Sequence, residues 1–140
     1  MIEIELKSNP EHPNKLSMKE NEQGVPHFHW RVTSRPHEWR PPTDVLETED
    51  AIIVRVEIAG MKNANFSVIL DEGNLIIRGV RSDQAERRAF HQMEIRFGEF
   101  STEVELHWEV DSQSIEAEYR DGLLWVTLPK TKPHSIKIES

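Results

Sequence analysis

With 140 residues, the chain has room for one folded domain with a hydrophobic core and short extensions. It contains no cysteine, which excludes disulfide bonds, thiolate metal sites and a cysteine nucleophile. The net charge is −8, and residues 41–140 carry all of it, with 11 basic and 19 acidic side chains. An acidic body of this kind argues against nucleic acid as a partner, because phosphate binding requires a basic face.

The N-terminus shows no basic stretch followed by an apolar run, which argues against a signal peptide. No apolar segment approaches the roughly 20 residues that a membrane-spanning helix requires. We therefore expect a cytoplasmic protein without a membrane span.

Residues 1–40 show no sustained period of a strand or a helix, and four of the eight prolines interrupt them. The sequence predicts a flexible N-terminal arm here. One short strand is expected within it, where Ile2, Ile4 and Leu6 alternate with polar residues.

Three aromatic residues of the arm, Phe28, Trp30 and Trp39, lie outside any strand pattern, so burial inside the domain does not explain them. Exposed aromatic side chains usually mark interaction surfaces. We expect these residues to contact partner proteins or to pack inside an oligomer, and the sequence favours neither over the other.

His27 and His29 would lie on one side of an extended segment, with His37 nearby, as in some metal sites and pH-sensitive switches. Two or three histidines in a flexible arm bind metal weakly, and no carboxylate spacing supports them. The sequence therefore predicts no metal site and no other cofactor, and leaves a pH response of these histidines open.

From Pro41 and Pro42 onwards, apolar residues alternate with polar ones almost throughout, which is the period of a β-strand. Turn signals separate short runs of this kind, and no segment shows a convincing helical period. The pattern predicts an all-β, immunoglobulin-like antiparallel β-sandwich. The predicted strands lie near 45–46, 52–58, 66–70, 75–81, 97–106, 115–119 and 123–128.

The clearest hairpin spans residues 117–130. Two alternating runs flank Asp121 and Gly122, and an Asp-Gly pair in this position is the strongest short-range signal of a tight hairpin turn. We predict a positive φ at Gly122, because the tightest turns require it and glycine adopts it without strain. Pro129 then removes a backbone donor and ends the second strand.

The hairpin sequence A-x-x-x-D-G-L-L, which ends in L-P-K, resembles the signature near the end of the alpha-crystallin domain of the small heat-shock proteins. Four further pieces follow the order and spacing of that family over residues 41–138. The resemblance implies an N-terminal arm at 1–40, an alpha-crystallin-type β-sandwich at 41–130 and a tail at 131–140. The four pieces are P-x-x-D-x-x-E from Pro41, L-x-I-x-G-x-R from Leu75, G-x-F from Gly98 and I-x-I from Ile136.

In the tail, Ile136 and Ile138 would point the same way on an extended segment. The resemblance implies that they dock into a groove between two strands of a neighbouring subunit; the alternative is a last strand of their own domain. Two buried isoleucines contribute at most roughly 3–6 kcal/mol before entropy, so one tail binds weakly and many tails bind well. The resemblance assigns the groove to Val68, Leu70, Ile115 and Ala117.

The loop at 82–93 is expected to form part of the dimer contact. Its second half, Ala89-Phe90-His91-Gln92, is predicted to form a short strand. In non-animal members of the family this segment crosses to pair with the first strand of a partner, and the resemblance implies the same here. The family commonly has an arginine, often tied to the dimer contact, two residues after the phenylalanine of G-x-F, and this chain has Thr102 in its place.

No catalytic constellation is present, because the sequence lacks G-x-S-x-G, H-E-x-x-H and a phosphate-binding glycine loop. The resemblance implies an ATP-independent holdase, not an enzyme, that binds unfolding client proteins as a homo-oligomer built from dimers. Two other classes stay open: a co-chaperone of the CS-domain type, and a small β-sandwich enzyme or ligand binder. The paired isoleucines and the hairpin motif argue against the first class, and no convergent polar cluster supports the second.

Overall fold

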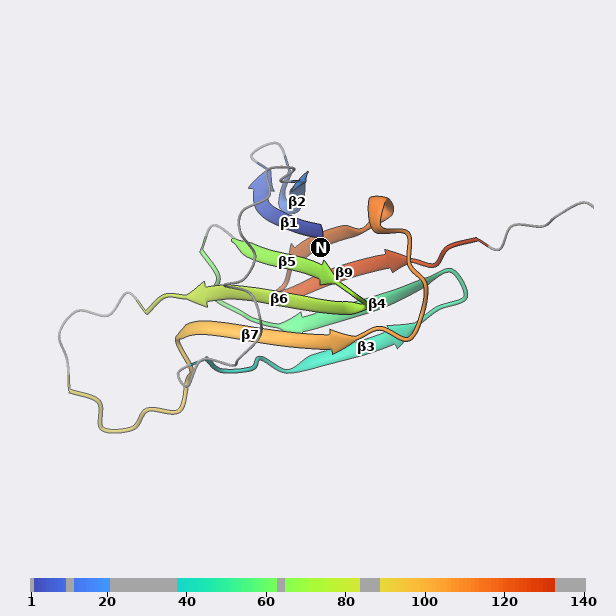
Figure 1. Ribbon diagram of the computed structural model, residues 1–140. Coiled ribbons are helices and arrows are strands. Elements are labelled where there is room, and N and C mark those ends of the chain that lie inside the picture. Colours follow the sequence, from blue (N-terminus) through green and yellow to red (C-terminus); the bar gives the residue numbers. More distant parts are fainter. Residues whose placement is uncertain (1, 10–11, 21–37, 63–64, 84–88, 133–140) are drawn as a thin grey trace, which may run out of the picture.

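Alternating apolar and polar residues produce a two-layered β-structure, seen in the computed structural model of the chain (Figure 1). The structure describes residues 2–9, 12–20, 38–62, 65–83 and 89–132, the first two ranges by their backbone. Within these ranges, the elements are β1 (Ile2–Asn9), β2 (His12–Glu20), β3 (Thr43–Glu47), β4 (Ala51–Glu57), β5 (Phe66–Asp71), β6 (Asn74–Arg81), β7 (Gly98–Glu105), the 3₁₀ turn η2 (Ser112–Ser114), β8 (Glu116–Arg120) and β9 (Leu123–Pro129).

Seven of these strands form the predicted antiparallel β-sandwich. One sheet has the order β3-β4-β9-β8, and the other has the order β5-β6-β7. Every strand expected between residues 45 and 128 is present within a few residues of its predicted position. The prediction of an all-β, immunoglobulin-like sandwich is therefore confirmed.

The core lies between the two sheets and consists of the apolar residues at alternating strand positions. On β4 and just after it, Ile52, Val54, Val56 and Ile58 are fully buried. Burying one such side chain contributes roughly 1.5–3 kcal/mol, so this row is a major part of the stability. The other members of the cluster are Phe66, Val68, Leu75, Ile77, Phe100, Val104, Leu106, Ile115, Ala117, Leu124, Val126 and Leu128.

The hairpin between β8 and β9 turns at Asp121 and Gly122, which have φ values of 51° and 76°. Two successive positive φ angles match the right-handed twist of the flanking strands, which is why Asp-Gly is favoured here. The prediction of positive φ at Gly122 is confirmed. A Cβ on this residue would lie 3.1 Å from the Cβ of Ala59, so its neighbourhood is also close.

The N-terminal residues form a hairpin that joins the two sheets on one side of the sandwich. β1 pairs with β5, and β2 pairs with β8, giving the continuous order β8-β2-β1-β5 (Figure 1). The short strand expected at residues 2–6 is part of β1, whereas β2 was not predicted. Pro13 argued against a strand at this position. It lies where the β1–β2 register shifts and regular pairing is interrupted, and proline is tolerated at such a position.

Candidate assembly surfaces

The four residues predicted to accept a tail come together where the hairpin joins the two sheets. Val68 from β5 and Ile115 and Ala117 from the β8 region are buried in one core cluster. Leu70 is half-buried and packs against the same cluster. The structure thus brings these residues together from two sheets, and their role in tail binding stays a prediction.

The edges of β5 and β8 at this place are paired with strands of the same chain. In the β1–β5 register, Ile2 lies opposite Leu70, and Ile4 lies opposite Val68. On the other side of the hairpin, β2 pairs with β8 through a single residue pair. On β5, the backbone groups that an incoming strand would need are therefore already engaged, whereas on β8 the pairing is limited to one residue pair.

The tail leaves the sandwich from a fixed position. The backbone amide of Lys130 donates to the carbonyl oxygen of Asp50 at 2.9 Å, and its ammonium lies 2.8 Å from a carboxylate oxygen of Glu47. The amide of Thr131 donates to the carbonyl of Glu109 at 3.1 Å. Ile136 and Ile138 lie outside the described residues, so neither docking nor a last strand of their own domain is tested.

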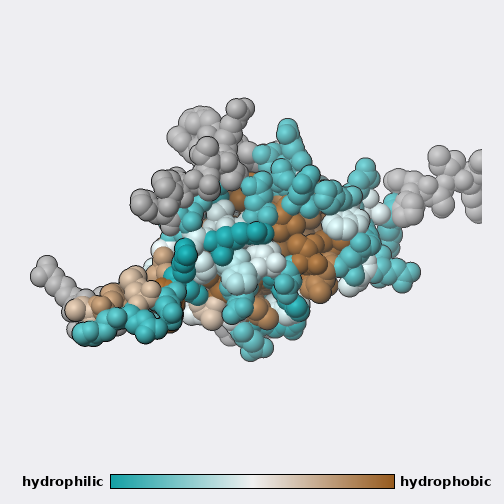
Figure 2. Space-filling model, turned by 90° about the horizontal axis from the view of Figure 1, so that it is seen from below, coloured by the Kyte–Doolittle hydropathy of each residue, from teal (hydrophilic) through white to brown (hydrophobic). Residues whose placement is uncertain are grey.

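In the structure the dimer loop, predicted at 82–93, extends from the end of β6 at Arg81 to the start of β7 at Gly98. Its last described part, residues 89–97, carries apolar side chains that face solvent. Phe90, Met93, Ile95 and Phe97 are all exposed, Met93 and Ile95 by 65% and 67%. Figure 2 shows this segment as a projection with apolar atoms at one end of the molecule. The short strand expected at Ala89, Phe90, His91 and Gln92 is not formed in the single chain, because the residue pairing that a strand requires is not made there.

Met93, Ile95 and Phe97 are the residues that sequence reasoning missed in this loop. They follow one another at every second position, as side chains on one face of a strand do. This alternation could have identified them, but the sequence interpretation placed Phe97 at the start of the next strand instead. The segment with a strand pattern therefore lies a few residues beyond the predicted one.

Arg81, at the end of β6, holds the two ends of this loop together. Its guanidinium carbon lies 4.6 Å from the ring centre of Trp39 and 5.2 Å from that of Phe97. The side chain also donates to the carbonyl oxygen of Arg96, from Nε at 2.9 Å and from a terminal nitrogen, and to that of Ala59 at 3.3 Å. These contacts fix where the loop leaves and re-enters the sandwich.

The outer strands β3 and β7 end the two sheets differently. The edge of β7 is covered, because the amide of Trp39 donates to Glu99 at 3.2 Å and the amide of Ser101 donates to Trp39 at 3.0 Å. Among the described residues, no strand pairs with the outer edge of β3. Val45 on β3 is 45% exposed. An open edge with an exposed apolar residue is a surface to which another strand can add.

Residues 44–139 match the model of the Hsp20/alpha crystallin family. The chain belongs to this family. It is 36% identical to heat shock protein 16 of Schizosaccharomyces pombe over 106 residues, which cover 73% of this chain and 74% of that protein. The fold is also similar to those of two solved small heat-shock proteins.

The structure of heat shock protein 16.0 from Schizosaccharomyces pombe has a TM-score of 0.61 at 32% identity, covering 76% of this chain and 80% of that one. A small heat-shock protein from Xylella fastidiosa has a TM-score of 0.60 at 27% identity, covering 74% and 99%. The description of that second crystal structure reports a distinct high-order structure of the Xylella protein.

Compared with the family pattern, this small heat-shock protein has a neutral hydroxyl at the arginine position. Thr102 is 1% exposed and accepts a hydrogen bond from Nε of Arg40 at 3.2 Å. Its hydroxyl lies 2.7 Å from that of Thr43, which itself donates to the carbonyl of Pro41 at 2.9 Å. Because the Thr43 proton is used there, Thr102 donates to Thr43. The guanidinium of Arg40 thus lies beside Thr102, the position at which the family commonly has an arginine.

Trp39 was expected to lie outside the domain, and this expectation is wrong. Its ring packs against the core, 5.7 Å from the ring of Phe100 between centres. The guanidinium of Arg81 lies over the same ring, so Phe100 and Arg81 of the sandwich both cover Trp39. Phe28 and Trp30 lie outside the described residues, and contact of any of the three with clients or other subunits stays a prediction.

Among the residues that the structure describes, no group of three potential metal ligands is found. His27, His29 and His37 lie outside them, so a metal or pH role of these histidines is untested. No helix in the described part of the chain is long and apolar enough to cross a membrane.

Proposed function

We propose that this chain is an ATP-independent holdase that binds unfolding proteins and prevents their aggregation without enzymatic chemistry. Membership of the small heat-shock protein family supports a chaperone role. The observation that carries the proposal is the row of Met93, Ile95 and Phe97, which is exposed in the described part of the single chain and would be open to clients when subunits separate. An acidic protein with such a row can stay dispersed and still bind apolar segments.

The dimer forms when residues 93–97 of one subunit add to the open edge of β3 in another. Strand addition satisfies the free backbone groups of the edge and places every second side chain on one face. Val45 on β3 and Ile95 in the loop supply apolar surface for the contact. The same exchange in the opposite direction closes a symmetric pair.

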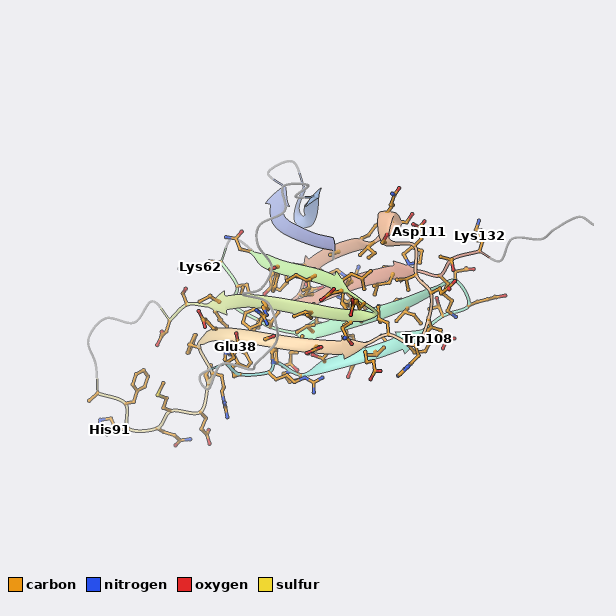
Figure 3. The ribbon with its side chains drawn as sticks, in the orientation of Figure 1. Glu38, Lys62, His91, Trp108, Asp111 and Lys132 are labelled. Carbon is orange, nitrogen blue, oxygen red and sulfur yellow. The ribbon has the colours of Figure 1, made fainter. Side chains whose placement is uncertain are left out.

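Larger assemblies form when Ile136 and Ile138 of one dimer dock beside Val68 and Ile115 of another. Figure 3 supports the compatibility of both contacts, because the loop bearing His91 and the start of the tail at Lys132 lie at opposite ends of the sandwich. Each tail contributes little, and several tails acting together hold the oligomer. A high-order structure is reported for the Xylella relative, which agrees with this proposal.

The holdase activity is tested by the turbidity of a heat-labile enzyme, with and without the protein and in the absence of nucleotide. We expect aggregation to be suppressed, and no effect of added ATP. Failure to suppress turbidity at a several-fold excess contradicts the holdase function. A dependence on ATP contradicts its nucleotide-independent form.

Assembly is tested by light scattering on two sets of variants. Ile136→Ala with Ile138→Ala should reduce the oligomer to dimers while the circular dichroism spectrum stays unchanged. Met93→Ser with Ile95→Ser, combined with the two tail substitutions, should yield monomers. Val80→Ser removes an apolar residue outside the loop that is 53% exposed and serves as the control. A co-chaperone of the CS-domain type predicts a small particle for the unmodified protein as well.

A further inference from the structure

The N-terminal hairpin occupies the strand edges that the proposed function assigns to a neighbour's tail. β5 has two edges, of which one pairs with β6 and the other with β1. β8 likewise lies between β9 and β2. One edge of a strand can pair with only one other strand, since each backbone group is used once. Docking of a tail and seating of the hairpin therefore exclude each other.

The two ends of the chain carry the same apolar pattern. β1 begins with Ile2-Glu3-Ile4, and the tail contains Ile136-Lys137-Ile138. In the hairpin, Ile2 and Ile4 take the register positions opposite Leu70 and Val68. A tail that adds to β5 would bring its two isoleucines to the same two positions. β1 and a docked tail would thus share both their strand pattern and their position on β5.

We infer that the β1–β2 hairpin is a removable cap on the tail-accepting groove, and that it controls assembly by competing with the tails of neighbouring subunits. This inference rests on the tail docking of the proposed function. A cap within the same chain lowers the apparent affinity for a tail in proportion to the fraction of groove that is uncovered. Assembly then responds to any condition that releases the hairpin.

The pairing of the hairpin indicates how it is released. β1 lies along β5 over five residue pairs, from Ile2–Leu70 to Leu6–Phe66. β2 is joined to β8 by the single pair of Lys15 with Glu118. The β8 side of the groove is therefore the more weakly covered one. A tail can begin to dock there and then displace β1 from β5.

The test locks the cap in place with a reversible bond. Glu5 and Ser67 are directly opposite in the β1–β5 register, and such partners have Cα atoms within the range of a disulfide. Because the chain has no cysteine, Glu5→Cys with Ser67→Cys forms one defined bond on oxidation. The full chain is used with Ile136→Ala and Ile138→Ala, so that its own tails do not interfere.

A fluorescent peptide of residues 131–140 is then titrated and followed by anisotropy. The oxidised protein should bind the peptide at least ~10-fold more weakly than the same protein after reduction. Deletion of residues 2–20 removes the cap and should give the tightest binding. As a matched control, Ile53→Cys with Thr127→Cys joins partners on β4 and β9, away from the groove, and should leave binding unchanged.

The outcomes separate the inference from the proposal on which it rests. Equal binding by the oxidised, reduced and deleted forms overturns the cap, while tail docking stands. If the peptide binds to none of the forms, the deletion variant included, tail docking fails and the cap fails with it. Should the cysteine pair prevent folding, the comparison of the deletion variant with the intact hairpin still decides the matter.

Discussion

The guanidinium of Arg81 lies over the indole ring of Trp39, with 4.6 Å between its carbon and the ring centre. Trp39 covers the edge of β7, and Arg81 also contacts Phe97 at the end of the dimer loop. One side chain therefore connects the segment that enters the sandwich to the loop that leaves it. The position of the loop depends on this contact, because residues 89–97 form no strand of their own.

Arg81→Ala should weaken the dimer as well as the fold. Removing the guanidinium removes the stacking on Trp39 and the hydrogen bonds to Arg96 and Ala59, which together contribute about 1–3 kcal/mol. The released loop ends would have to be ordered when a partner binds, so the dimer dissociation constant should rise by about tenfold. Sedimentation equilibrium with the tail isoleucines replaced by alanine measures this constant.

Arg120→Ala is the matched control for this variant. Arg120 also lies over a tryptophan, with 5.0 Å from its guanidinium carbon to the ring centre of Trp125, but it does so on β8 and β9. We expect this control to leave the dimer constant unchanged. An equal loss of dimer in both variants contradicts a specific role of Arg81 at the loop.

Gly122→Val should destabilise the sandwich by well over about 1 kcal/mol. A β-branched residue is strained at a φ of 76°, and its side chain would also meet Ala59. Gly60 has the same φ, but a Cβ there meets nothing within 4 Å, so Gly60→Val isolates the backbone strain. Urea denaturation should rank the Gly122 variant as the less stable of the two. An unchanged midpoint for Gly122→Val contradicts the tight turn.

Thr102→Val should lower the free energy of unfolding by about 1–2 kcal/mol, because the shape is kept and two hydrogen bonds are lost. The variant leaves the Arg40 guanidinium and the Thr43 hydroxyl without this partner. Thr127→Val, on the half-buried outer face of β9, is the control and should change stability little. Equal stability of Thr102→Val and the unmodified protein in thermal unfolding means that water replaces the lost bonds.

The seven strands of the sandwich were predictable because each has a local signal. Ile52, Val54 and Val56 alternate on β4, and Asp121-Gly122 marks the turn between β8 and β9. A period of two and a residue with positive φ are properties of neighbouring residues, so one sequence is sufficient to detect them. Val68 and Ile115 lie in one core cluster, and only the family resemblance suggested that they come together, because strand order depends on contacts between distant segments. Their role in accepting a tail stays a prediction.

The N-terminal hairpin and the burial of Trp39 could not be predicted in the same way. β2 contains Pro13 and few apolar residues, and it forms a strand because β8 and β1 offer edges for pairing. Trp39 has no strand pattern around it and packs only because Phe100 and Arg81 lie beside it. Both features depend on tertiary partners, which local periodicity does not report.

Deleting residues 1–37 should leave the sandwich folded and greatly reduce its protection of a heated client. The deletion ends before Glu38 because Trp39 and Arg40 contact β7 and Thr102, so they belong to the folded part. The removed segment has little net charge and includes Phe28 and Trp30, whereas the rest of the chain carries the acidic excess. Aromatic side chains outside the sandwich core can contact many partners, as a promiscuous binder must.

The deletion also removes the β1–β2 hairpin, so a second variant separates the two effects. Phe28→Ser with Trp30→Ser keeps the hairpin and removes the aromatic side chains, whereas deletion of residues 2–20 does the reverse. If the aromatic residues bind clients, the serine variant should lose most of the suppression of turbidity. The hairpin deletion should keep it, because the aromatic residues of several subunits in one oligomer still act together. Full protection by the serine variant shows that the main client surface lies elsewhere, and the exposed row at Met93, Ile95 and Phe97 is then the next surface to alter.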